Sequence, residues 1–142
     1  MMNLLLLIHL AATLVMVGLI WFVQVVHYPL FDQVGRADFR RYEEMHQRLT
    51  TLVVAPPMLA EAVTSVLLLW LRPTVVPIGA VGIGLLLVGT IWASTFFWQV
   101  PAHAKLSRAF DAGTHRRLVR SNWLRTVAWS VRGVLVCWMV SK

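Results

Sequence analysis

The sequence predicts an all-α integral membrane protein, a single-domain bundle of four transmembrane helices. Of its 142 residues, 58% are hydrophobic and 13% are charged, whereas soluble domains carry roughly 25% charged residues. Four long apolar segments each reach the roughly 20 residues that a helix needs to cross the hydrocarbon core of a membrane. These segments cover about residues 4–28, 50–71, 75–100 and 120–141.

The basic residues are distributed unequally between the two ends of the predicted bundle. Residues 29–49 contain four arginines and residues 101–121 contain five lysines and arginines, whereas the opposite end has only Arg72 and Lys142. Because an excess of Lys and Arg marks cytoplasmic loops, we expect a bacterial inner membrane protein with both long loops in the cytoplasm and both termini outside. The net charge of +7 then indicates topology and contact with the lipid bilayer, and not nucleic-acid binding.

The last apolar segment carries charges where lipid disfavours them. Asn122, Arg125, Trp129 and Arg132 recur at helical spacing and share one face, and an arginine at mid-bilayer costs several kcal/mol unless it meets a partner. Counted along the helices at about 1.5 Å per residue, Glu61 lies at the depth of Arg132. The sequence therefore predicts a Glu61–Arg132 ion pair, with Arg125 nearer the surface and able to extend towards it.

Two interpretations of the Glu61–Arg132 pair remain open. The pair can fix helix packing as a neutralised unit, or its protonation can drive movement of a proton or a substrate. On the second interpretation Glu61, Arg132 and Arg125 are candidate catalytic residues. Gln24, Gln99 and Asn122 form a predicted polar layer in the bundle core.

The two halves of the chain share features that suggest a tandem duplication of a helical hairpin. Gln24-Val25 and Gln99-Val100 recur at nearly the same offset as Arg40-Arg41 and Arg116-Arg117. The third span also contains a Gly79-x-x-Gly82 pair, and small residues of this kind let helices approach closely in lipid.

Histidines gather at the predicted cytoplasmic boundary and suggest a metal site. Glu43-x-x-His46 has the spacing that presents two ligands together in carboxylate-bridged metal bundles, and imidazole with carboxylate suits Zn, Fe or Mn. Interfacial histidines also contact headgroups and water, which is the competing interpretation. The candidate metal ligands are His27, Glu43, His46, His103 and His115.

His9 lies near the opposite end of the first span. A lone histidine in a helix is either hydrogen-bonded to its neighbours or, in the sharper interpretation, an axial haem ligand. The chain has no Cys-x-x-Cys-His motif, so a bound haem would be of the non-covalent b type.

The first half resembles the HemJ-type protoporphyrinogen oxidases. The matching residues are His9, the aromatic stretch from Gly18 to His27, and Tyr42-Glu43-x-Met45-x-x-Arg48-Leu49 followed by Pro56-x-Met58. The resemblance implies an all-helical fold associated with haem b, with His9 as the ligating histidine and Arg48 as a second cofactor-binding candidate. It covers about residues 5–60, and the second half lacks the Lys- and His-bearing third span of that family.

These observations favour a membrane-embedded redox or cofactor-binding protein that acts on a lipophilic small molecule, with haem b as the leading cofactor. A His/Glu-bound transition metal is the alternative cofactor, and a protein without a cofactor is the third case. The alternative functions are a small proton-coupled transporter that uses Glu61–Arg132, assembled as a homo-oligomer because four spans enclose little volume, and a structural subunit of a membrane complex. An oxidoreductase activity thus stays one of three interpretations.

Overall fold

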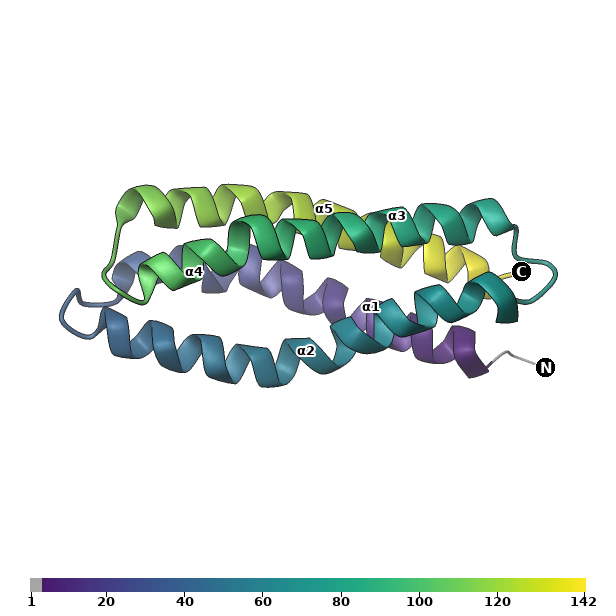
Figure 1. The fold of residues 1–142 in the computed structure, drawn as a ribbon, viewed down its shortest axis with the longest axis horizontal. Coiled ribbons are helices and arrows are strands. Elements are labelled where there is room, and N and C mark those ends of the chain that lie inside the picture. Colours follow the sequence, from purple (N-terminus) through teal and green to yellow (C-terminus); the bar gives the residue numbers. More distant parts are fainter. Residues whose placement is uncertain (1–3) are drawn as a thin grey trace.

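The computed structural model describes residues 4–142, and within this range the elements are helical (Figure 1). In chain order they are α1 (Leu4–Phe22), the π-helical η1 (Val23–His27), the 3-10 helix η2 (Pro29–Gln33), α2 (Phe39–Leu71), α3 (Ile78–Ser94), the π-helical η3 (Thr95–Gln99), α4 (Val100–Leu106) and α5 (Ala112–Val140).

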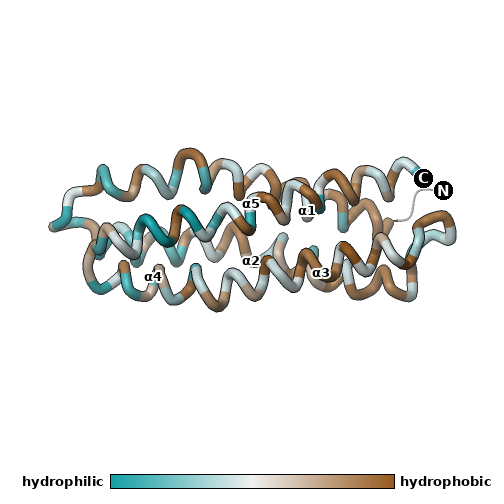
Figure 2. Tube along the Cα trace, turned by 90° about the horizontal axis from the view of Figure 1, so that it is seen from above, coloured by the Kyte–Doolittle hydropathy of each residue, from teal (hydrophilic) through white to brown (hydrophobic). Residues whose placement is uncertain are grey.

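These elements form four long antiparallel rods: α1 with η1, α2, α3 with η3 and α4, and α5 (Figure 1). α1 packs against α2 and α5, and α3 packs against α5. The loops around 34–38 and 107–111 lie at one end of the bundle, and the turn at 72–77 lies at the other end with the start of α1 and the end of α5 (Figure 1). We call these the loop end and the terminal end. The polar residues concentrate towards the loop end (Figure 2).

Three helical segments are long and apolar enough to cross a membrane: Leu4–Gln33, Phe39–Leu71 and Ile78–Leu106. α5 is not among them, because its five arginines lower its hydropathy. The all-helical prediction is therefore confirmed for the described residues, and three of the four rods have the length and composition needed to cross a membrane. The helices α2 and α5 also extend beyond the predicted spans, and begin at Phe39 and Ala112 respectively.

A π-helical segment ends the apolar part of the first and third rods. η1 contains the buried Gln24, and η3 contains the buried Gln99. π-helical turns arise where one extra residue enters a helix, and they occur often at functional sites. The shared order of apolar helix, π-helical segment and proline (Pro29 and Pro101) agrees with the suggested duplication, which stays a prediction.

The expected close packing at Gly79 and Gly82 does not occur. A Cβ atom placed on either glycine would meet nothing within 4 Å, because both residues face outward. The tight glycine contact lies instead on α5, where a Cβ on Gly133 would approach Val17 of α1 to 3.1 Å.

The start of α5 is fixed by Asp111. Its Oδ2 accepts hydrogen bonds from the Thr114 backbone N–H at 2.9 Å and from Lys105 Nζ at 3.1 Å, which satisfies a free donor of the first helical turn. Hydrogen bonds from the Thr114 hydroxyl and backbone, and from Lys105, hold the pKa of Asp111 below its usual range.

Candidate functional site

Three of the predicted metal ligands meet at the loop end of the bundle. Glu43 and His46 lie one turn apart on α2, and His103 lies on α4. Glu43 is fully buried, and its Oε1 lies 2.5 Å from Nδ1 of His103. One potential ligand atom from each of the three residues lies within 4.8 Å of the others. We call Glu43, His46 and His103 the Glu43 cluster, and this cluster can hold a metal ion.

The Glu43 cluster is held in place by side chains from three elements. The Tyr28 hydroxyl lies 2.9 Å from Nε2 of His103, and His27 Nε2 lies 2.8 Å from Nδ1 of His46. Gln47 donates to Glu43 Oε1 at 3.2 Å. Bonds of this kind to one ring nitrogen of a histidine fix its orientation. They leave Nε2 of His46 without a protein partner among the described residues, whereas Nδ1 of His103 lies against Glu43 Oε1, so a metal ion bound there would replace that direct contact.

One atom of the Glu43 cluster lacks a partner. Oε2 of Glu43 is buried and accepts no hydrogen bond from the described residues. A buried carboxylate oxygen without a donor is costly, and native proteins rarely leave such a group unpaired. Since Oε1 already contacts His103 and Gln47, Oε2 is the position at which a cation would satisfy the site.

The other two predicted metal ligands lie outside the cluster. His27 contacts the ring of His46, and it does not belong to the group of residues whose ligand atoms lie close enough together to share one metal ion. His115 bonds the backbone oxygen of Tyr28 through Nε2 at 2.7 Å and stacks on Phe31. The predicted set of five is therefore too large: His115 packs on the chain behind the cluster, and His27 orients a cluster residue.

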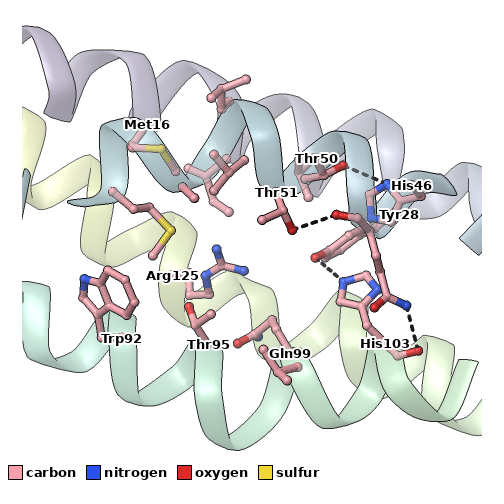
Figure 3. Close-up of a pocket in the computed structure, with 18 residues that line it drawn as sticks. Met16, Tyr28, His46, Thr50, Thr51, Trp92, Thr95, Gln99, His103 and Arg125 are labelled. Atoms are coloured by element: carbon pink, nitrogen blue, oxygen red, sulfur yellow. Dashed lines mark hydrogen bonds between the residues drawn. The ribbon is translucent and has the colours of Figure 1, made fainter. Parts of the chain in front are cut away.

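A cavity of about 280 Å³ lies beside the Glu43 cluster, between α1, α2 and the third rod. His46, His103 and Tyr28 form one end of the cavity, and Met16, Met58 and Trp92 line the other (Figure 3). The cluster is thus open to a space with a largely apolar wall.

Arg125 of α5 points into the middle of this cavity (Figure 3). It is 6% exposed, so its side chain lies inside the bundle and does not extend to the surface. Its Nη1 donates to the amide oxygen of Asn122 at 3.2 Å, and its guanidinium lies 5.1 Å from the Trp129 ring centroid. Asn122 in turn donates to Gln24 at 3.0 Å, because the polar face of α5 turns inward.

The predicted polar core is present as two separate groups. Gln24 accepts from Asn122 and donates to the Val119 carbonyl. Gln99 accepts from Ser94 at 3.0 Å and donates to Ser121 at 3.2 Å. The side chains of Gln24, Gln99 and Asn122 thus all have hydrogen-bond partners inside the bundle, as burial requires.

The predicted ion pair forms in the deep interior. Arg132 Nε donates to Glu61 Oε1 at 2.8 Å, and the Trp129 indole N–H donates to Glu61 Oε2 at 2.9 Å. Thr13 also donates to Glu61 Oε1. Arg132 is fully buried, and its remaining nitrogens contact the Gly84 carbonyl, Ser65 and His9.

His9 belongs to this interior network and does not fit the role of a haem ligand. Its Nδ1 lies 2.7 Å from the Thr64 hydroxyl, and its Nε2 lies 3.3 Å from Arg132. Both ring nitrogens are therefore engaged by protein groups. The adjacent cavity has a volume of about 10 Å³, which is far too small for a haem group. Arg48 lies on an exposed face of α2 towards the loop end and makes no contact with His9.

Sequence reasoning missed two contributors to the site. Tyr28 was not singled out as a site residue, although it is 4% exposed and its hydroxyl bonds His103. Gln47 was not singled out, although it joins Glu43 to the α4 backbone and to Ser107. The position of Gln47 one turn beyond Glu43 on a mixed polar helix was the available signal.

No family model, curated protein or solved structure matches the chain. The case for a function therefore depends on the chemistry of the site.

Proposed function

We propose that the protein is a membrane-embedded, metal-binding protein of the redox class, which binds a transition metal at the Glu43 cluster and acts on a lipophilic small molecule in the adjoining cavity. The observation that carries the proposal is the buried, unpartnered Oε2 of Glu43 beside two imidazoles. A divalent cation supplies the missing partner and offsets the buried negative charge.

The ligand set favours a reactive metal over a purely structural one. Structural zinc sites use four protein ligands, whereas catalytic sites keep a position open. Two histidines and one carboxylate with open positions are typical of non-haem iron oxygenases and of hydrolytic zinc sites. When bound, such a metal supplies Lewis acidity or one-electron chemistry. His46 and His103 line the cavity, so the open positions would face a bound lipophilic molecule.

The surrounding residues have supporting roles in this proposal. The Tyr28 hydroxyl holds the second nitrogen of His103, and His27 holds Nδ1 of His46. Gln47 keeps the Glu43 carboxylate in one orientation through its amide. This arrangement replaces the haem of the sequence-based interpretation with a metal held by side chains, and it keeps the redox class.

We also propose that α5 crosses the membrane as the fourth span. Its inward face holds the arginines, whereas Val127, Val131 and Val134 on its outer face are 55%, 47% and 73% exposed. Apolar outer positions of this kind suit contact with lipid. The loop end would then face the cytoplasm of a bacterial inner membrane, since it carries the basic excess.

The Glu61–Arg132 pair serves structure in this proposal, and not transport. A proton-carrying carboxylate needs a path for the proton, but both oxygens of Glu61 are bonded within the protein. The neighbouring cavity of about 10 Å³ is at the lower limit for one water molecule.

The metal content of purified protein tests the proposal. The full chain in a neutral detergent is incubated with Fe(II), Mn(II) or Zn(II), freed of excess ion and analysed for bound metal. We expect one ion per chain, lost in His103→Ala and Glu43→Gln but retained in His115→Gln. His115 is the matched control because it is a nearby histidine outside the cluster.

Two results would contradict the proposal. One is a wild-type chain that retains no stoichiometric metal at micromolar free ion. The other is a Soret band that disappears in His9→Ala, which would return haem as the cofactor. Helix content and elution volume, compared with the wild type, exclude misfolding as the cause of lost metal.

A further inference from the structure

Arg125 is a buried cation without a matching anion. Its residue is 6% exposed, and none of the five ion pairs among the described residues includes it. Its side-chain partners are the amide of Asn122 and the hydroxyl of Tyr28, and both are neutral groups. Burying a charge is costly unless it is paired, and the other buried arginine of the bundle, Arg132, does have its carboxylate.

The free side of this guanidinium has a defined geometry. Nη1 donates to Asn122, whereas Nε is buried without a hydrogen-bond partner among the described residues. The Nε and Nη2 hydrogens point in the same direction as a fork, and this fork matches the two oxygens of a carboxylate. Arg125 thus presents a carboxylate-binding edge to the cavity (Figure 3).

The cavity around this edge is otherwise uncharged and largely apolar. Among the residues that line it, none is an aspartate or a glutamate, and Arg125 is the single Lys or Arg. Met16, Ile20, Met58 and Trp92 form the wall on the inner side. A volume of about 280 Å³ lies near the lower end of the roughly 300–1,000 Å³ range of ligand pockets. This size suits a single hydrocarbon chain better than a two-chain phospholipid.

We propose that the cavity binds a long-chain carboxylic acid, with the carboxylate on the Nε–Nη2 edge of Arg125 and the chain against the apolar wall. The claim that this acid is the substrate rests on the proposed function, whereas binding of the acid in the cavity requires no metal. The polar side chains Thr50, Thr95 and Gln99 also line the cavity, and they surround the head-group position on the side towards the cluster.

This binding mode fixes which part of the molecule lies near the metal site. Arg125 lies between the apolar wall and the pair His46 and His103 (Figure 3). The carboxyl end of the bound acid therefore faces the Glu43 cluster, and the methyl end lies towards Met16 and Trp92. The acid end, and not the chain end, is the part that the metal site can reach.

Equilibrium binding of dodecanoate tests the inference. The full chain is placed in nanodiscs of phosphatidylcholine, and binding of labelled dodecanoate is compared with that of dodecanol and dodecyl phosphate, with empty nanodiscs subtracted. We expect one saturable site for dodecanoate, with dodecanol about 10- to 100-fold weaker because it lacks the charge-assisted hydrogen bonds. Arg125→Gln should abolish the difference between acid and alcohol, and Arg125→Lys should retain part of it.

Controls separate this inference from the metal proposal and from misfolding. Arg120→Gln removes an exposed arginine of the same helix and should bind dodecanoate as the wild type does. Glu43→Gln removes a metal ligand that does not line the cavity, so it should lose metal and keep dodecanoate. Metal binding without acid binding would overturn this inference alone, and acid binding without metal binding would overturn the proposed function alone.

Three outcomes would overturn the inference. One is equal affinity for dodecanoate and dodecanol, and another is unchanged dodecanoate binding in Arg125→Gln. The third is a different occupant, which tighter binding of dodecyl phosphate or stoichiometric phospholipid in the purified protein would reveal. Quenching of Trp92 checks the orientation: a bromine on the terminal carbon should quench more than one beside the carboxylate, and Trp92→Phe should remove that difference.

Discussion

Arg132 and Glu61 form an ion pair in which Nε lies 2.8 Å from Oε1 and neither side chain is more than 3% exposed. The two residues are on α5 and α2, so the pair joins two rods of the bundle. Every polar group of the pair has a partner, since Thr13 and Trp129 donate to the carboxylate. In an apolar interior, each member of such a pair stabilises the folded protein mainly because it neutralises the charge of the other. Removal of one partner therefore lowers the free energy of unfolding more than removal of both.

This relationship predicts the outcome of a double-mutant cycle. Arg132→Leu should destabilise the protein by about 3–5 kcal/mol, because it leaves a buried carboxylate without its counter-charge. The Glu61→Leu/Arg132→Leu double variant should lose less than the sum of the two single variants. Unfolding by denaturant in mixed micelles measures the free energies. Additive losses would show that the pair is not coupled.

The indole of Trp129 gives a second prediction. Trp129→Phe keeps the ring but removes the donor to Glu61 Oε2, which is 2.9 Å away, and a buried acceptor without a donor costs about 1–3 kcal/mol. Trp21→Phe is the matched control, because its donor bonds Ser130 at an exposed position over a similar 3.0 Å. We expect a drop in unfolding free energy for the first variant and almost none for the second. Equal effects would contradict a special role for the Glu61 contact.

The sequence predicted those contacts that depend on helical periodicity. Glu61 and Arg132 were paired from their depth along two uninterrupted helices, and Glu43 and His46 from their spacing of one turn on α2. In both cases the intervening backbone is regular α-helix, so the 3.6-residue period gives the facing direction correctly.

One of the two missed contacts, that of Tyr28, follows irregular backbone, whereas Gln47 lies on the regular helix α2. Tyr28 comes directly after the π-helical η1, and an extra residue in a helical turn rotates everything beyond it relative to an α-helical projection. The sequence left the direction of Arg125 open, because an arginine near a helix end can extend outward or fold inward. In the structure its contacts with Asn122 and Trp129 hold it inward.

Alanine at three glycines should have effects that differ in sign. Gly82 faces open space, so Gly82→Ala should stabilise by about 0.5–1 kcal/mol through helix propensity. A Cβ on Gly133 would lie 3.1 Å from a methyl of Val17, and this stiff β-branched side chain cannot easily move aside. We expect Gly133→Ala to destabilise by about 1–3 kcal/mol. Gly84→Ala should lie between them, since its Cβ would meet Arg132 at an ordinary 3.5 Å.

The thermal midpoints of the three variants in one detergent check this order. The carbonyl of Gly84 accepts from Arg132, so Gly84→Leu is expected to be worse than Gly84→Ala because a larger side chain displaces the guanidinium. A stabilised Gly133→Ala would mean that α1 and α5 are less tightly packed than the 3.1 Å contact implies.

Asp111 should make the start of α5 sensitive to acid. Its pKa in the folded protein is held below the usual range by hydrogen bonds from Thr114 and Lys105. A lowered pKa stabilises the folded state above the unfolded value of about 3.9, and this contribution disappears as the pH falls through the folded pKa. The difference in thermal midpoint between the wild type and Asp111→Ala should be constant near neutral pH and shrink in strong acid. A difference that grows on acidification would contradict the assignment.

His27 gives a prediction about positioning within the metal site. It is outside the Glu43 cluster, but its Nε2 lies 2.8 Å from Nδ1 of His46. Loss of a group that orients a ligating histidine typically lowers metal affinity by about 10- to 100-fold without removing the metal. We therefore expect His27→Ala to weaken metal binding by that factor while His46→Ala abolishes it. Titration with Zn(II) against a competing chelator measures both affinities. A His27→Ala chain that binds no metal would make His27 a ligand in its own right. A His27→Ala chain that binds metal as tightly as the wild type would show that His27 is not needed to orient His46. Thr50, whose hydroxyl lies 3.0 Å from the same nitrogen of His46, would then hold that ring.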